Sequence, residues 1–165
     1  WVGPRKWPHD FGFNANAVEV KTTKGKKHQV IHISNERQLD DAGLENLFLF
    51  MASIDLSISA GITLPEMILS IKEKLKADSL ASLNFKETLF EAGYLEQWAE
   101  QYHAKFSVRE TYIFRIREGF PRIVERDIPN GVGDVNYSIA ASECMHFCVK
   151  EEELISVIGG RTNES

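Results

Sequence analysis

Two carboxylates and a lysine stand close together in this sequence, at a spacing that suits a catalytic site. Asp10 follows Pro8-His9, and Glu19 and Lys21 flank Val20 in a short alternating stretch. In a β-strand, side chains two residues apart point to the same face, so Glu19 and Lys21 are expected to be neighbours, about 6–7 Å apart between Cα atoms. A tight turn is then enough to bring Asp10 to the same place.

These residue types suit the hydrolysis of a phosphodiester bond. That reaction needs a divalent metal, which neutralises developing charge on the phosphate and lowers the pKa of a bound water. Mg²⁺ is held by one or two carboxylates, a carbonyl oxygen and waters, so Asp10, Glu19 and the backbone carbonyl of Val20 are the expected ligands of Mg²⁺ or Mn²⁺. Lys21 is expected to orient the attacking water and to offset charge in the transition state.

Spacing alone leaves a second interpretation open. Asp10, Glu19 and Lys21 would then form a surface ion-pair cluster on an inactive fold. Geometry separates the two interpretations, because a metal site requires the side chains to converge within reach of one ion.

Positive charge is concentrated in the same part of the chain. The net charge of the 165 residues is −5, but residues 1–37 carry a net charge of +4 and the remainder −9. A polyanion such as DNA is expected to dock there. The predicted DNA-binding residues are Lys24, Lys26, Lys27 and Arg37. The alternative is that Lys24 to Lys27 only form a solvated hairpin turn.

Length and composition predict one soluble globular domain. Hydrophobic residues make up 43% of the chain and charged residues 26%, with no apolar run long enough to span a membrane. The 2 cysteines favour a reducing setting, so a cytoplasmic location is expected. The chain starts at Trp1 instead of Met, and we expect it to be trimmed or to be the C-terminal part of a longer protein.

The elements that would position the opening residues are strands. We expect a strand over 17–22, a turn at Gly25 and a second strand over 28–33, antiparallel to the first. Ser34 or Asn35 is expected to begin a helix. Residues 44–58 are apolar on both faces, which is typical of a central strand.

The second half of the chain predicts a mixture of helices and strands, and hence an α+β (α/β) class overall. Thr63 and Glu66 form a capping box that starts a helix with Pro65 in its first turn. Further helices are expected over 84–92, 95–104 and 151–158, and further strands over 106–117, 122–128, 135–141 and 144–149.

Cys144, His146 and Cys148 alternate in a way that would place three metal ligands on one strand face. Structural zinc needs four ligands, and no second cluster of ligands exists in the sequence, so we favour buried or half-buried thiols. A Cys–His nucleophile pair is disfavoured because no third group is available to orient it.

The opening residues also resemble a known motif. Pro8-His9-Asp10 followed by Glu19-Val20-Lys21 looks like the PD-(D/E)XK motif of restriction-endonuclease-like nucleases. The wider run is similar to a bacterial family of PD-(D/E)XK motif proteins found with restriction and phage-defence systems. Its matching segments are Trp7–Phe11, Glu19–Thr23, Ile33–Leu39, Gly119–Ile123 and Tyr137–Val149, so the resemblance covers most of the chain.

The resemblance implies a fold and a set of roles. The fold would be a restriction-endonuclease-like mixed β-sheet flanked by helices, with residues 1–62 as a partial nuclease core. Residues 63–165 would form a smaller helical and β region packed on that core. Asp10 and Glu19 match the metal ligands, Lys21 the catalytic lysine, and Gln38 a polar residue near the active centre. In related folds a helix and a strand precede the first motif strand, and we expect both to be missing from this chain, which starts at Trp1.

The function implied is a metal-dependent DNA endonuclease of restriction or phage defence. The expected partners are DNA and either a second copy of the chain or other subunits of a defence complex, with no membrane. The alternative is a non-catalytic DNA-binding or assembly subunit that keeps the basic face on an inactive nuclease fold.

Overall fold

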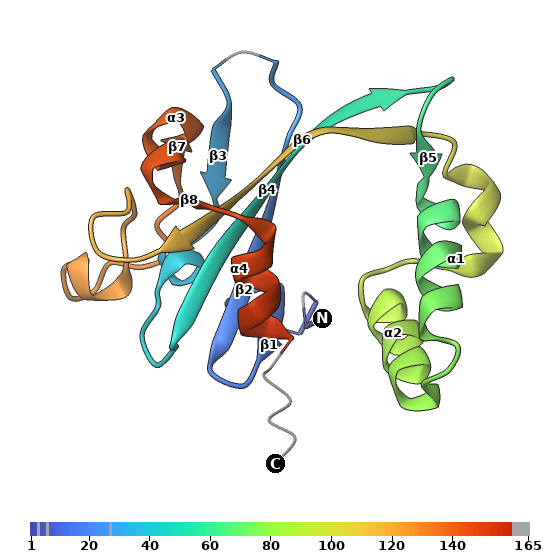
Figure 1. The fold of residues 1–165 in the computed structure, drawn as a ribbon, viewed down its shortest axis with the longest axis horizontal. Coiled ribbons are helices and arrows are strands. Elements are labelled where there is room, and N and C mark those ends of the chain that lie inside the picture. Colours follow the sequence, from blue (N-terminus) through green and yellow to red (C-terminus); the bar gives the residue numbers. More distant parts are fainter. Residues whose placement is uncertain (3, 6, 27, 160–165) are drawn as a thin grey trace.

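The computed structural model describes residues 1–2, 4–5, 7–26 and 28–159 (Figure 1). A six-stranded mixed sheet forms the centre, with the order β1-β2-β4-β6-β5 and β8 paired to β6. A separate two-stranded sheet pairs β3 with β7. The strands are β1 Phe11–Phe13, β2 Asn16–Thr23, β3 Val30–Ile33, β4 Asn46–Ser57, β5 Ile62–Thr63, β6 Lys105–Ile116, β7 Tyr137–Ala140 and β8 Cys148–Val149.

The first hairpin of the sheet joins β1 to β2 antiparallel, with Phe13 opposite Asn16. Asn14 takes a left-handed φ of 51° in the two-residue turn, a conformation that asparagine tolerates well. β2 then pairs with β4 in parallel, and β4 pairs with β6 antiparallel from Leu47 to Ser57, with a register shift between Ser53 and Ile54. β2 therefore lies between β1 and the central strand β4.

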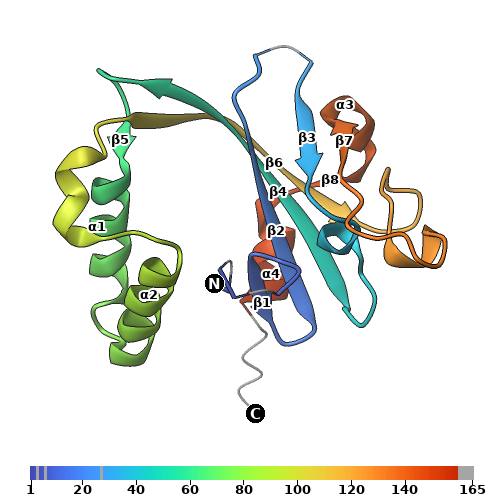
Figure 2. The same ribbon diagram turned by 180° about the vertical axis from the view of Figure 1, so that it is seen from behind.

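The core lies on both faces of β4, as the apolar run over 44–58 predicts. Leu47, Leu49 and Met51 face one side, where they pack with Ile31 and Ile33 of β3. The opposite face of the sheet holds a second cluster, in which Phe48 of β4 packs against Leu154 of helix α4. Figures 1 and 2 show α4, Glu151–Ile158, on one side of the sheet and the β3–β7 pair on the other.

The remaining long helices stand at the far end of the β4–β6 ribbon (Figure 1). α1, Leu64–Leu75, begins with the predicted capping box, since Thr63 and Glu66 satisfy each other's backbone amides. α2, Ser79–Glu91, packs beside α1. The shorter helical elements are η1 Glu36–Leu39, η2 Glu96–Gln101, η3 Glu125–Asp127, α3 Ala141–Cys144 and η4 Met145–Phe147.

The predicted pairing of the 28–33 strand with the first strand is wrong. β3 pairs with β7, with Ile31 opposite Ile139. The edges of β2 are already used, one by β4 and the other by β1 and by the Asp10 side chain at Val20. β3 therefore lies against the face of the sheet instead of its edge.

Three predicted elements of the second half differ from the structure. The strand expected over 122–128 is a single turn, η3, because the Asp127 side chain binds back to the backbone of Val124. The helix expected over 84–92 starts earlier, because the Asp78 side chain caps it by accepting from Ala81. The helix expected over 95–104 is the shorter 3₁₀ helix η2, Glu96–Gln101.

The Cys144–Cys148 segment is not a continuous strand, so its side chains do not share one strand face. α3 and η4 occupy it, and only Cys148 belongs to a strand. Cys144 is buried and Cys148 is exposed. Burial raises the pKa of the Cys144 thiol to about 11, so the thiol stays protonated and acts as a small apolar side chain.

Candidate active site

Glu19 and Lys21 lie side by side on one face of β2, as the alternation predicts. The Lys21 Nζ is 2.8 Å from Glu19 Oε1. Val18 belongs to the core cluster on the opposite face, together with the half-buried Val20. The pair is almost closed to solvent, since only 2% of the Glu19 side chain is exposed.

Asp10 comes to the same strand from the segment before β1. Its Oδ2 accepts a hydrogen bond of 2.9 Å from the backbone amide of Val20. In an extended strand the N–H and C=O of one residue point to the same edge, so the Val20 carbonyl also points to the edge where Asp10 lies. The carboxylate of Asp10 and the carbonyl of Val20 are therefore brought to one edge of β2, just before the start of β1.

The electrostatics of the site centre on Glu19. Burial is the largest effect and raises the pKa of Glu19 to about 7. The hydrogen bond and the charge of Lys21 act to lower this pKa, whereas the charge of Asp10 acts to raise it further. Asp10 is thus close enough for the two carboxylates to repel each other, and a bound cation would relieve that repulsion.

The available donors fit a hard cation such as Mg²⁺. Two carboxylates and a backbone carbonyl are oxygen ligands, and Mg²⁺ normally completes its shell with waters and substrate oxygens. Among the described residues, no group of three His, Cys, Asp or Glu side chains surrounds a single point. Any metal held here would therefore depend on Asp10, Glu19 and Val20, with water or phosphate filling the remaining positions.

Gln38 reaches the same site from η1. Its Oε1 accepts hydrogen bonds of 2.8 Å from Lys21 Nζ and of 2.8 Å from the Ser34 amide. The ammonium group of Lys21 is therefore held between a carboxylate on its own strand and an amide oxygen from another element. This places Gln38 beside the Glu-x-Lys pair.

The predicted DNA-binding residues lie in two different settings. Lys24 and Lys26 are exposed between β2 and β3. Arg109 holds the intervening Gly25 through a hydrogen bond of 2.9 Å to its carbonyl. Arg37 is half-exposed but lies 3.1 Å from Asp134, so part of its charge is matched within the protein. Lys27 falls outside the described residues.

His9 is a neighbour of the site to which the sequence interpretation gave no role. It is 5% exposed, and its ring packs edge-on against Trp7 at 5.1 Å. Neither ring nitrogen has a hydrogen-bond partner in the described part of the chain. Burial lowers the pKa of His9, against opposing effects of Asp10 and Asp40. The signal in the sequence that could have pointed to His9 is its position directly before Asp10.

The fold and the site together define a class: a mixed α+β protein with a curled mixed sheet flanked by helices, carrying Asp and Glu-x-Lys in the manner of PD-(D/E)XK proteins. The family model described as "Putative PD-(D/E)XK family member, (DUF4420)" matches residues 1–142. This chain belongs to that family.

No curated protein and no solved structure matches the chain. Across the described residues, no helix has the length and apolar character needed to cross a membrane.

Proposed function

We propose that this chain carries the active site of a metal-dependent DNA endonuclease that hydrolyses phosphodiester bonds. The observation that supports it best is the Lys21 ammonium, which lies 2.8 Å from Glu19 and 2.8 Å from Gln38, on the strand that also anchors Asp10. Asp10, Glu19 and the Val20 carbonyl would hold Mg²⁺ or Mn²⁺. The metal would supply charge neutralisation and a more acidic bound water.

The chain's own residues would then have separate tasks. Glu19 is removed from water, so its carboxylate interacts strongly with any cation beside it. Lys21 would donate to the attacking water or to a phosphate oxygen, with Gln38 fixing the direction of its ammonium. Lys24, Lys26, Lys27 and Arg37 would contact the phosphate backbone of DNA, which makes binding salt-dependent.

We propose a role in restriction or phage defence, with DNA as the substrate and a second copy or other subunits of a defence complex as protein partners. The protein is proposed to act in the cytoplasm.

A non-catalytic DNA-binding or assembly role is the competing proposal. It is favoured by the small number of carboxylates, since only Asp10 and Glu19 approach each other at this site among the described residues. In that role Lys21 and Glu19 would be a buried ion pair, and the exposed lysines would bind DNA without cleaving it.

A cleavage assay separates the two proposals. Supercoiled and linear DNA are incubated with the protein in Mg²⁺, in Mn²⁺ and in EDTA, beside the Lys21→Ala variant. We expect metal-dependent cleavage by the wild type and a loss of about 10²–10³-fold in Lys21→Ala, because one preorganised transition-state donor contributes about that much. DNA affinity should change little. If the wild type binds DNA but cleaves it under none of these conditions, the result would contradict the nuclease proposal and favour the non-catalytic role.

A further inference from the structure

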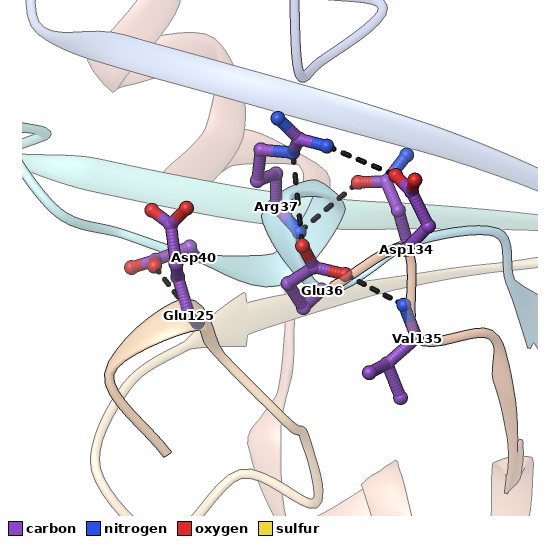
Figure 3. A network of polar contacts seen from close by, with 7 residues as sticks. Glu36, Arg37, Asp40, Glu125, Asp134 and Val135 are labelled. Atoms are coloured by element: carbon purple, nitrogen blue, oxygen red, sulfur yellow. Dashed lines mark hydrogen bonds and ion pairs between the residues drawn. The ribbon is translucent and has the colours of Figure 1, made fainter. Parts of the chain in front are cut away.

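The residues on both sides of Gln38 are tied to one distant stretch of the chain, residues 122–135. Figure 3 shows the first of these ties, in which Glu36 Oε2 accepts a hydrogen bond of 2.8 Å from the Val135 amide. Arg37 lies beside it, with a guanidinium nitrogen 3.1 Å from Asp134 Oδ1 (Figure 3). The start of η1 is therefore fastened to residues about a hundred positions away.

The end of η1 is fastened to the same stretch by Arg122. One of its nitrogens donates to the Leu39 carbonyl at 2.6 Å, and another donates to Asp41 Oδ2 at 2.9 Å. Only 7% of the Arg122 side chain is exposed, so these charge-assisted bonds are poorly screened by water. Asp40 adds a longer contact of 3.4 Å from the Glu125 amide (Figure 3).

Gln38 stands apart from its neighbours in η1. Its side-chain oxygen turns to Lys21 and to the Ser34 amide, whereas Glu36, Arg37 and the Leu39 carbonyl bond to residues 122–135. Most of η1 is thus held by residues 122–135, whereas the Gln38 side chain of the same turn contacts the site.

We propose that residues 122–135 form a clamp on η1 that holds Gln38 against Lys21, and that Glu36 and Arg122 are positioning residues for the site. This inference rests on the proposed function, because it assigns the clamp a role in setting the direction of the Lys21 ammonium. Among the described residues, no hydrogen bond or ion pair joins the clamp to Asp10 or Glu19.

The clamp matters because η1 depends on contacts outside itself. It is a single 3₁₀ turn of 4 residues, and its backbone hydrogen bonds are long, at 3.3 Å from Gln38 to Asn35 and 3.2 Å from Asp40 to Arg37. A lone turn of this kind is marginal without tertiary contacts. The Asn35 cap and the buried Leu39 hold η1 on one side, and the bonds to residues 122–135 hold it on the other. Loss of those bonds is therefore expected to loosen Gln38.

Ser34 supplies a direct reporter of the clamp. It is exposed at the end of β3, and its amide donates to Gln38 Oε1. Hydrogen exchange at the Ser34 amide therefore measures how firmly Gln38 is held, in the absence of DNA and metal.

The test compares Glu36→Ala and Arg122→Ala with a matched control, Arg126→Ala. Arg126 lies in the same segment and is exposed, and within the described residues it makes no hydrogen bond to η1. Each variant is measured for thermal unfolding, for exchange at Ser34 by NMR, and for kcat and KM on DNA. The two clamp variants are then repeated in a Gln38→Ala background.

We expect faster Ser34 exchange in Glu36→Ala and Arg122→Ala, but not in Arg126→Ala. Their kcat should fall by about 10–100-fold with KM little changed, because a positioning defect acts on the reacting geometry. In the Gln38→Ala background the clamp substitutions should cause little further loss. If either alanine variant fails to fold, Glu36→Gln and Arg122→Lys replace them and should show smaller changes in the same direction.

Two results would overturn the inference. One is unchanged Ser34 exchange in folded clamp variants. The other is a loss of kcat that multiplies with the Gln38→Ala loss, which would mean that the clamp acts by another route. If the wild type cleaves no DNA, the proposed function fails, and Ser34 exchange alone then decides whether the clamp holds Gln38.

Discussion

Glu19 is a carboxylate that the fold removes from water while placing it near a second carboxylate, Asp10. Its pKa is raised from 4.5 to about 7, mainly by burial. The folded protein therefore keeps a proton on Glu19 at pH values where the unfolded chain has lost it. As a result, this group lowers the free energy of unfolding as the pH rises from about 4.5 through about 7, by at most about 3 kcal/mol.

The Glu19→Gln variant tests this at the residue scale. The free energy of unfolding of this variant should depend less on pH than that of the wild type. At about pH 8 the variant should unfold at a higher temperature than the wild type, by roughly 2–4 °C for each kcal/mol recovered. Thermal unfolding across this range measures the effect, with the exposed Glu45→Gln as the control. His9 acts in the opposite sense, because its lowered pKa makes protonation destabilising at acid pH, and the comparison of variants removes that contribution.

Metal should reverse the penalty at Glu19. A divalent ion competes with the proton, so Mg²⁺ is expected to raise the unfolding temperature of the wild type more at about pH 8 than at about pH 5. Glu19→Gln should lose most of this response. An equal response of wild type and variant to Mg²⁺ would place the ion elsewhere.

At the scale of the elements, the turn before β5 depends on Gly61. Its φ is +103°, and a Cβ built there would clash with the Phe106 carbonyl oxygen. Gly61→Ala should therefore destabilise the protein by about 2–4 kcal/mol, from backbone strain and from the contact with β6. Gly133→Ala is the matched control, because its Cβ would meet nothing within 4 Å. Denaturant unfolding of both variants checks this, and equal stability would contradict it.

Some elements could be predicted from local sequence and others could not. The β4 run and the Thr63–Glu66 capping box carry their own signals, so both were predicted correctly. The partner of β3 depends on which edges of β2 remain open, and this is decided by Asp10 and β1. η3 depends on a side-chain bond from Asp127, which strand propensity does not reveal.

In the candidate site, too, some features could be predicted from local sequence and others could not. The shared face of Glu19 and Lys21 follows from the two-residue period of a strand, and the structure confirms it. The ties that hold Gln38 join η1 to residues 122–135, so they are visible only once the chain is folded. The burial of His9 behind Trp7 is likewise a tertiary effect.

At the scale of the whole molecule, the division of the chain into residues 1–62 and 63–165 stays a prediction. Strands from both ranges pair in the central sheet. β6 comes from the second range and pairs with β4 as far as Ser57 opposite Lys105. The helices α1 and α2 lie between these strands in the sequence and stand at the end of the ribbon (Figure 2).

Because Ser57 and Lys105 are cross-strand partners, a short turn can join them. Replacing residues 58–104 by such a turn should keep the β2–β4–β6 register and the bond from Lys21 to Gln38. The packing of Trp1 on Phe85 would be lost, so the shortened chain should be less stable. NMR shifts of the β2 and β4 amides measure the outcome. A chain that no longer forms the sheet would show that the helices are part of one folding unit with it.

The most direct measurement of the central claim is the location of a bound Mn²⁺ ion by anomalous diffraction from crystals of the protein. The proposed site predicts one peak in contact with the Asp10 and Glu19 carboxylates and the Val20 carbonyl, and no such peak in crystals of Asp10→Asn. An ion bound elsewhere, or a wild-type site that stays empty at saturating Mn²⁺ while Lys21 keeps its contact with Glu19, would contradict the account.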